Sequence, residues 1–431
     1  MTSPSCSLAF SFAFFIFIAA VSSSTGGGKL HHFRARKKPI ADPFNELHYL
    51  VSSSMARALH LKNPYNTTLP LSTNRIGAYS LPLNVGTPPQ SLTFVMDTGS
   101  NFVWSPCTSR YVCKRCSNLL PTPTTNIPAF IPKQSSSSKI LSCSSPKCSW
   151  IHHRISRCDE EVTQCSPYFI FYGTGSTGGV PMLDTLRLKD LTVPDFLIGC
   201  SVVSTGQPAG IAGMGRGSSS LPSQLNLTKF SYCSFSFKSL NDQSAKSSVL
   251  LDYSPSRSHK KTEGMIYTPF LRNPRISNKL AYLVYYYVGI RGITVGGRNV
   301  KIPFKFLTPN KADGNGGAVI DSGSTFSYLS RDIFDLVSRE MIAQMTAKGN
   351  KRNVAAETEN ELGPCFDSLS KNLSVPQIAF RFKGGSQLVL PMENYMATVG
   401  NGAATVCLAV ITDQGGDEGE GPGIILGNLE G

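Results

Sequence analysis

Two short motifs in this chain place an aspartate where it can take part in acid–base chemistry. Asp97-Thr98-Gly99-Ser100 recurs, with one conservative change, as Asp321-Ser322-Gly323-Ser324, and each copy ends a hydrophobic, strand-like run. One Asp-(Thr/Ser)-Gly is weak evidence, whereas two copies in matching contexts are hard to obtain by accident. The repeat predicts two related halves, each of which gives one carboxylate to a shared site.

A pair of neighbouring carboxylates is suited to the hydrolysis of amides. Like charges close together cannot both form easily, so the pair holds one proton over a range of acidic pH. The ionised member can take a proton from water while the protonated member polarises a carbonyl oxygen. The hydroxyls of both motifs can orient the carboxylates, and the motif glycines, Gly99 and Gly323, let another backbone approach closely. This chemistry requires no metal, cofactor or covalent intermediate.

The residues before the first motif have the alternation of β-strands. Residues 79–85 alternate and stop at Gly86-Thr87-Pro88-Pro89, and residues 91–96 then run into Asp97. This pattern predicts two strands joined by a turn. Residues 168–172 form an aromatic strand that ends at Gly173-Thr174-Gly175-Ser176, where the alternating glycines predict a hairpin with a mobile tip.

Several other segments have recognisable patterns. Residues 332–348 have the spacing of an amphipathic helix, whose methionines we expect in the core. Residues 221–225 are a short helix candidate, and residues 282–295 are strand-like. Residues 117–142 predict an irregular insertion, and the Ser/Lys-rich residues 239–263 predict the region between the two halves.

Length and composition favour a globular β protein of two lobes. The chain has 431 residues, is 41% hydrophobic and 16% charged, and contains 38 glycines and 28 prolines. Its formal net charge is +14, with a basic excess in residues 25–75 and no block of charge elsewhere. This distribution favours a solvated basic surface over a nucleic-acid-binding surface.

The N-terminus and the cysteines indicate the secretory route. Residues 1–24 contain a largely apolar run that has the length of a signal-peptide core and is too short to span a bilayer. Cys113-x-x-Cys116 has no second cysteine or histidine pair at zinc-site distance, so we expect disulfides rather than a metal site. The disulfide candidates are Cys107, Cys113, Cys116, Cys143, Cys148, Cys158, Cys165, Cys200, Cys365 and Cys407, and the glycosylation candidates are Asn66, Asn226 and Asn372.

The combination of motifs resembles the pepsin-type aspartic proteases, in particular the atypical, nepenthesin-like plant branch. It consists of both Asp motifs, the Tyr-Gly-x-Gly-Ser turn between them, and the apolar-apolar-Gly motifs at residues 211–213 and 425–427. The cysteine-rich insertion before the turn and residues 210–217, 230–233 and 286–297 add to it. The resemblance implies an all-β, bilobal, pepsin-like double β-barrel with pseudo-twofold symmetry and a few short helices.

The resemblance also implies roles for individual residues. Asp97 and Asp321 would be the catalytic dyad, and Thr98 and Ser322 would form hydrogen bonds across the pseudo-twofold axis. Tyr172, with Gly173, Thr174 and Gly175, would belong to a flap over the substrate, and Trp104 would donate a hydrogen bond to Tyr172. For Trp104 the alternative is a plain core aromatic, and for Tyr172 a cross-strand packing residue.

The expected organisation is a signal peptide in residues 1–24, a candidate pro-segment in residues 25–75, an N-terminal lobe in residues 76–255 with the Cys-rich insertion, and a C-terminal lobe in residues 256–431. The basic segment in residues 25–75 is either a pro-segment that pairs with the dyad or a linker. Relatives of this type continue beyond Gly427 through further strands, so we expect a C-terminally truncated lobe of reduced stability. Cys233 would then have no partner, and Cys365 would pair with Cys407.

Two functions are compatible with these residues. The first is a secreted, monomeric aspartic endopeptidase that hydrolyses polypeptides at acidic pH in the apoplast, the cell wall or the vacuole, without cofactor, nucleic acid or membrane span. The second is a binding protein on the same fold, similar to plant glycanase inhibitors, which have usually lost part of the dyad or flap. The presence of Asp97, Asp321 and Tyr172 favours the enzyme. A structural wall glycoprotein fits the sequons but gives no reason for two Asp motifs.

Overall fold

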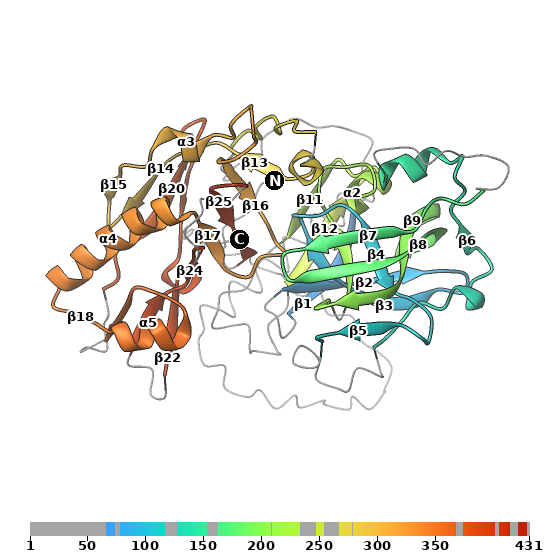
Figure 1. Cartoon of the computed structure of the whole chain (residues 1–431), viewed down its shortest axis with the longest axis horizontal. Helices are drawn as coiled ribbons and strands as arrows, with labels where there is room; N and C mark the ends of the chain where they lie inside the picture. Colours follow the sequence, from blue (N-terminus) through green and yellow to red (C-terminus); the bar gives the residue numbers. More distant parts are fainter. Residues whose placement is uncertain are drawn as a thin grey trace, which may run out of the picture. The chain divides into compact units, whose positions relative to one another are not determined.

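The computed structural model describes residues 66–73, 78–116, 127–152, 163–207, 209–232, 247–253, 267–277, 279–367, 374–400, 405–413 and 421–428. The expected signal peptide and most of the candidate pro-segment lie outside these residues. In the part that is described, the strands form one large sheet and three smaller ones, and no ladder joins the large sheet to the others (Figure 1). This division corresponds to two lobes.

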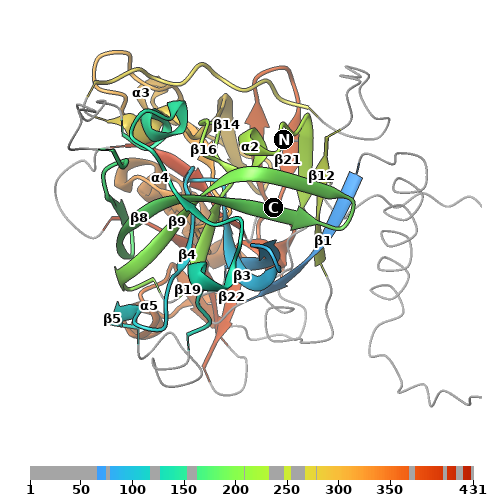
Figure 2. The same ribbon diagram turned by 90° about the vertical axis from the view of Figure 1, so that its right-hand side faces the viewer.

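The N-terminal lobe contains a 12-stranded sheet. Its main path runs β11-β12-β1-β2-β3-β10-β4-β9-β8-β6, with β5 on β9 and β7 on β8. Figure 2 shows β1, β3, β4, β8 and β9 of this lobe from a second direction. The bounds are β1 (Asn66–Thr73), β2 (Tyr79–Val85), β3 (Gln90–Asp97), β4 (Val103–Pro106), β5 (Val112–Lys114), β6 (Lys139–Ile140), β7 (Tyr168–Tyr172), β8 (Gly175–Leu188), β9 (Leu191–Thr205), β10 (Gly210–Gly213), β11 (Lys229–Tyr232) and β12 (Ser247–Asp252).

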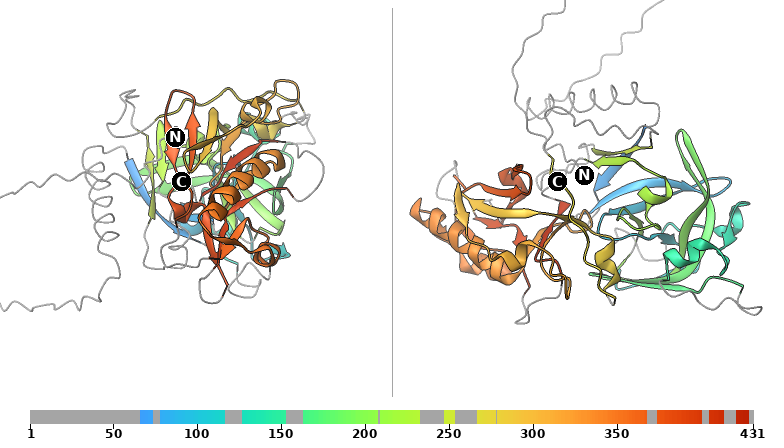
Figure 3. Two further views of the ribbon diagram at one scale, coloured as in Figure 1. Left: turned by 90° about the vertical axis from the view of Figure 1, so that its left-hand side faces the viewer. Right: turned by 90° about the horizontal axis from the view of Figure 1, so that it is seen from above.

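The C-terminal lobe contains three smaller sheets. The right-hand view of Figure 3 shows this lobe mostly in orange and red, beside the blue and green N-terminal lobe. The first has β13 (Tyr286–Val288), β16 (Ala318–Ile320), β25 (Ile424–Leu426), β17 (Ser327–Leu329) and β24 (Val410–Ile411). The second has β15 (Arg298–Val300), β14 (Ile290–Val295), β20 (Ile378–Phe382) and β21 (Gln387–Val389), and the third has β18 (Lys351–Arg352), β19 (Cys365–Asp367), β23 (Thr405–Leu408) and β22 (Met396–Val399).

Helices are few and mostly short in the described residues. The α-helices are α2 (Leu221–Gln224), α3 (Phe304–Leu307), α4 (Arg331–Ala347) and α5 (Val354–Asn360). Single 3₁₀ turns are η2 (Pro132–Gln134), η3 (Pro146–Trp150), η5 (Leu280–Leu283) and η6 (Met392–Asn394). The expected all-β, bilobal architecture is therefore confirmed. None of the described helices is long and apolar enough to cross a membrane.

The two lobes repeat one arrangement around the Asp motifs. In the N-terminal lobe, β10 pairs in parallel with β3 and antiparallel with β4. In the C-terminal lobe, β25 pairs in parallel with β16 and antiparallel with β17. The two apolar-apolar-Gly motifs lie on β10 and at the end of β25, so each one adjoins the strand that leads to an aspartate. The repeat in the sequence is thus a repeat in space.

Each lobe has its own hydrophobic core. The N-terminal core includes Leu81, Phe94, Met96 and Phe196, all of which are fully or almost fully buried. In the C-terminal lobe, α4 packs against β14 and β17. Its buried positions are Ile333, Val337, Ser338, Met341 and Met345, which confirms the predicted helix and the core role of its methionines.

Disulfides lie in both lobes. The described residues include the pairs Cys107–Cys200, Cys113–Cys116, Cys148–Cys165 and Cys365–Cys407. Cys143 is also disulfide-bonded, whereas Cys158 and Cys233 lie outside the described residues. Cys365 and Cys407 lie opposite each other in the β19–β23 ladder, as expected. The expectation that Cys113 and Cys116 form disulfides is confirmed, since they pair with each other.

Four segments have structure that their sequence patterns did not predict. Residues 282–295 do not form one strand, because the chain leaves the β13–β16 ladder at Val288 and enters the β14–β20 ladder at Ile290. The expected inter-lobe region contains β12, whose buried Val249 and Leu251 join it to the N-terminal sheet through β1 and β11. Residues 66–73, in the range given to the candidate pro-segment, form β1. The described part of the insertion, 127–142, contains η2 and β6.

The buried face of α4 provides a test of the C-terminal core. Met341 is fully buried, so we expect Met341→Ala to lower the free energy of unfolding by about 2–5 kcal/mol through lost contacts and a residual cavity. Arg339→Ala, on the exposed face of the same helix, is the matched control and should have little effect. Urea unfolding of both variants checks this. Equal losses in the two variants would show that the helix does not pack as described.

Candidate active site

The two Asp motifs meet where the lobes face each other. Asp97 is the last residue of β3, and Asp321 follows β16 directly. The hydrophobic strands therefore end at the site, and the Thr/Ser-Gly-Ser residues after them form two loops. A loop of small residues at this point lets the backbones of the two lobes approach closely.

The loops are joined by crosswise hydrogen bonds between Thr98 and Ser322. The backbone N–H of Thr98 donates to Oγ of Ser322 at 3.1 Å, and the N–H of Ser322 donates to Oγ1 of Thr98 at 2.8 Å. Each hydroxyl then donates to a carbonyl of the opposite lobe, Thr98 to Ile320 at 3.1 Å and Ser322 to Met96 at 2.9 Å. Both side chains are fully buried. Each loop thus satisfies the polar groups of the other.

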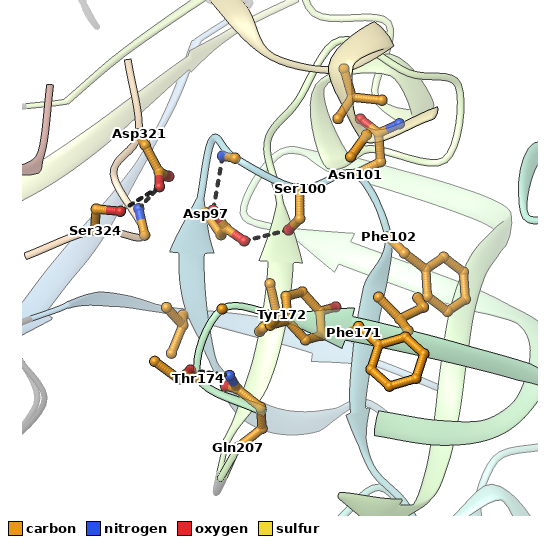
Figure 4. A pocket seen from close by; sticks show the side chains of 18 of the residues that line it. Asp97, Ser100, Asn101, Phe102, Phe171, Tyr172, Thr174, Gln207, Asp321 and Ser324 are labelled. Atoms are coloured by element: carbon orange, nitrogen blue, oxygen red, sulfur yellow. Dashed lines mark hydrogen bonds between the residues drawn. The ribbon is translucent and has the colours of Figure 1, made fainter. Parts of the chain in front are cut away.

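Each carboxylate is held in the same way by its own loop. Oδ1 of Asp97 accepts the N–H of Gly99 at 2.8 Å, and its Oδ2 accepts the hydroxyl of Ser100. In the other lobe, Asp321 accepts the N–H of Gly323 at 2.9 Å and the hydroxyl of Ser324 at 2.6 Å. Figure 4 shows the matching pairs. The two aspartates are therefore equivalent in geometry.

The motif glycines lie against the carboxylate of the opposite lobe. A methyl group added at Gly99 would lie 2.7 Å from Oδ1 of Asp321, and one added at Gly323 would lie 2.5 Å from Oδ1 of Asp97. These separations are shorter than any real contact of a Cβ atom. The close approach of the two carboxylates therefore requires glycine at both positions.

The two carboxyl groups interact electrostatically. Burial, followed by the negative charge of Asp321, raises the pKa of Asp97 from 3.8 to about 7. The hydrogen bonds from Ser100 and Gly99 act the other way but are weaker. The pair therefore retains a proton at a pH at which an ordinary aspartic acid is ionised.

A hairpin formed by β7 and β8 lies beside the dyad. Tyr172 is the last residue of β7, and its hydroxyl accepts a hydrogen bond of 2.8 Å from Nε1 of the fully buried Trp104. Burial, followed by the charge of Asp97, raises the pKa of Tyr172, so its phenol stays protonated. The turn that follows contains Gly173 and Thr174, and the strand resumes at Gly175.

A cavity of about 1330 Å³ opens between this hairpin and the two aspartates. Its lining comes from both lobes and includes residues to which the sequence analysis gave no individual role: Phe102, Trp150, Ile151, Ile170, Gln207, Tyr285 and Phe326. Burial, followed by the charge of Asp321, raises the pKa of Tyr285 to about 12, which places this tyrosine within electrostatic reach of the dyad. The sequence analysis gave Tyr285 no role because it placed this residue in a strand, whereas the residue follows the 3₁₀ turn η5 and faces the cavity.

The lobes are also connected beside the dyad loops. The hydroxyl of Tyr286 donates to the carbonyl of Met214 at 2.8 Å, and the N–H of Arg216 donates to the carbonyl of Val284 at 2.9 Å. Met214 and Arg216 follow β10, so these bonds link the segment after the first apolar-apolar-Gly motif to the cavity wall formed by Val284 and Tyr285. The opposed loops are thus part of a broader contact.

The other predicted residues lie in different settings. The paired cysteines are structural and lie outside the cavity lining. Asn226 has a positive φ of 51° after α2 and is exposed. Asn66 begins β1, and Asn372 lies outside the described residues. Within the described ranges, no cluster of three or more His, Cys, Asp or Glu has the arrangement of a metal site.

Two family models match the chain. One is described as xylanase inhibitor N-terminal and matches residues 79–251, and the other is described as xylanase inhibitor C-terminal and matches residues 285–430. The aspartic proteinase nepenthesin-1 of Nepenthes gracilis is 33% identical over 361 residues, which cover 82% of this chain and 73% of that protein. Nepenthesin-2 of the same species is 30% identical over 434 residues, with coverages of 95% and 91%.

Solved structures give a likeness of fold. The crystal structure of edgp superimposes with a TM-score of 0.62 and 21% identity, covering 85% of this chain and 90% of that chain. Basic 7S globulin from soybean has a TM-score of 0.60 and 18% identity, with coverages of 85% and 91%. At these identities the likeness concerns the fold alone.

The crosswise hydrogen bonds can be tested through stability. Thr98→Val removes a hydroxyl whose loss leaves the buried N–H of Ser322 and the carbonyl of Ile320 without their partner. We expect the free energy of unfolding to fall by about 1–3 kcal/mol. Thr98→Ser keeps the hydroxyl and is the matched control. If urea unfolding of Thr98→Val matched that of Thr98→Ser, the contact between the loops would not have the importance given to it here.

Proposed function

Because this chain has the two-lobed pepsin-like fold and belongs to the plant branch of the pepsin-type aspartic protease family, we propose that it is an aspartic endopeptidase that hydrolyses peptide bonds at acidic pH. The observation that supports this most is the pair of carboxyl groups held by opposed loops, one of them with a raised pKa. A pair of this kind can supply an acid and a base to one substrate.

The proposed reaction uses the single proton of the pair. The ionised carboxylate takes a proton from a water molecule as that water attacks the scissile carbonyl carbon. The protonated carboxyl donates a hydrogen bond to the carbonyl oxygen and stabilises the tetrahedral adduct. The carboxyl that took the proton from water then gives it to the amide nitrogen, the C–N bond breaks, and the pair is left with the single proton with which it began. Because the two aspartates titrate as a unit, the proton belongs to the pair rather than to one residue.

The substrate would be an extended polypeptide in the cavity between the lobes. Apolar walls from Phe102, Ile170 and Phe326 suit hydrophobic side chains on either side of the scissile bond. Tyr172 would cover the bound peptide, and its bond with Trp104 fixes the ring while leaving its hydroxyl proton free to be donated. Exclusion of water beneath the hairpin would strengthen the hydrogen bonds made by the dyad.

We further propose that the protein acts outside the cytosol as a monomer. The apolar segment in residues 1–24 and the disulfides of both lobes suit a secreted protein of the apoplast or cell wall, with the vacuole as an alternative destination. The proposed chemistry uses no metal or cofactor.

A second candidate function is inhibition of a glycanase. The names of both matching family models favour it, since they refer to xylanase inhibitors. An inhibitor needs a surface complementary to its target and does not need a dyad whose carboxylates, loops and glycines all match in the two lobes. The geometry of the dyad therefore favours the protease.

Substitution of either aspartate tests the proposed reaction. Asp97→Asn and Asp321→Asn each remove one carboxyl while keeping its shape, and we expect digestion of an unfolded protein at acidic pH to fall by about three orders of magnitude. Asp335→Asn, exposed on α4, is the matched control and should digest at the normal rate. Undiminished digestion by both dyad variants would refute the assignment. Inhibition of a xylanase by the same variants would support the second candidate.

The pH profile tests the shared proton. Activity requires one proton on the pair, and the pKa of Asp97 is raised to about 7. Because a raised pKa means that the proton is lost only at higher pH, activity should be present at acidic pH and disappear as the pH rises through that value. Initial rates measured on one peptide across the pH range check this. Activity that increased with pH through neutrality would contradict the mechanism.

A further inference from the structure

We infer that Gln207 is a positioning residue that holds the tip of the β7–β8 hairpin over the dyad. The inference rests on the proposed function, because the hairpin is relevant to catalysis only if a substrate lies beneath it. It concerns a residue that neither the Asp motifs nor the hairpin sequence identifies.

Gln207 makes a direct hydrogen bond to the tip. Its Nε2 donates to Oγ1 of Thr174 at 2.7 Å, and Figure 4 shows the two side chains together near Tyr172. The Gln207 residue is only 7% exposed, so this amide has little water to replace its partner. Thr174 is two residues after Tyr172, and therefore the bond fixes the turn that carries the tyrosine.

The backbone of the tip also touches the segment that carries Gln207. The ladder between β8 and β9 continues to the pair Ser176–Thr205. A methyl group added at Gly175 would lie 1.8 Å from the carbonyl oxygen of Thr205, and one added at Gly206 would lie 2.4 Å from that of Thr174. Glycines on both sides permit this contact, and Gly206 has a positive φ of 64°.

Gln207 is itself held by the cysteine-rich part of the lobe. Its carbonyl accepts hydrogen bonds from Oγ of Ser204 at 2.7 Å and from the hydroxyl of Tyr111 at 3.0 Å. The preceding N–H, of Gly206, donates to the carbonyl of Lys114 at 2.8 Å. Lys114 ends β5, which pairs with β9 and contains one half of the Cys113–Cys116 disulfide. The hydrogen bond to Thr174 therefore comes from an anchored residue.

The hairpin is thus held at two points, by Trp104 through Tyr172 and by Gln207 through Thr174. Loss of the second bond would let the tip populate positions away from the dyad. The dyad itself depends on β3, β16 and their loops, so its chemistry would change little. Removal of the Gln207 amide should therefore weaken substrate binding more than it slows the chemical step.

Trp104 provides a readout that does not need activity. The chain has two tryptophans, so Trp150→Phe leaves Trp104 as the only one. In that background we expect Gln207→Ala to increase quenching of Trp104 fluorescence by acrylamide, because the tip that covers it opens more often. Gln207→Glu, which retains an oxygen that can bond with the Thr174 hydroxyl, should restore protection. Thr192→Ala, an exposed truncation on β9, is the matched control and should leave quenching unchanged.

Kinetics of the full chain with native Trp150 complete the test. For Gln207→Ala we expect KM for a peptide to rise about three- to tenfold, the equivalent of one hydrogen bond, with kcat almost unchanged. Thr174→Val should have a similar effect, and the double variant should be no worse than either single one. Unchanged quenching in Gln207→Ala, or additive effects in the double variant, would overturn the inference. If Gln207→Ala increased the quenching but the unsubstituted chain had no peptidase activity, the proposed function would be wrong. The positioning of the hairpin tip by the hydrogen bond between Gln207 and Thr174 would still be supported.

Discussion

The crosswise hydrogen bonds between Thr98 and Ser322 are the contact on which the rest of the site depends. They join loops from two lobes that share no β-ladder in the described residues, and they satisfy backbone groups that are buried away from water. The hydroxyl of each loop accepts a hydrogen bond from the buried backbone N–H of the other, so neither loop satisfies its polar groups alone. The relative placement of the two carboxylates follows from this reciprocal arrangement.

This contact brings together groups that repel each other. Asp97 is buried beside Asp321, and both effects disfavour its ionised form. Hydrogen bonds from the following glycine and serine hold each carboxylate in place, while Gly99 and Gly323 leave room for the opposite oxygen. The hydrophobic strands β3 and β16 provide rigid support from below, and the β7–β8 hairpin limits access from the other side. The packing around the dyad therefore has two results: the aspartate pair retains a proton, and the hairpin covers the cavity beside it.

The sequence predicted the parts of the site that repeat or carry unusual residues. The duplicated Asp motifs, the aromatic strand before Gly173 and the resemblance to one family led to the dyad, Tyr172 and Trp104. Gln207 and Tyr285 were missed, because a glutamine in a loop and one tyrosine among several have no distinctive local pattern. Their roles come from tertiary contacts with Thr174 and with the dyad. The same applies to β12, whose short apolar alternation is hidden in a Ser/Lys-rich region and becomes a strand only through its partners β1 and β11.

The most direct test of the account is a titration of the dyad carboxyl groups by NMR, with isotopically labelled aspartate in the full chain. The signals can be assigned from the variants in which each aspartate is replaced by asparagine. The account predicts that Asp97 titrates with a pKa raised well above 3.8, toward about 7, and that Asp321→Asn lowers this pKa by removing the neighbouring charge. An Asp97 signal that titrates near 3.8 and does not respond to Asp321→Asn would contradict it.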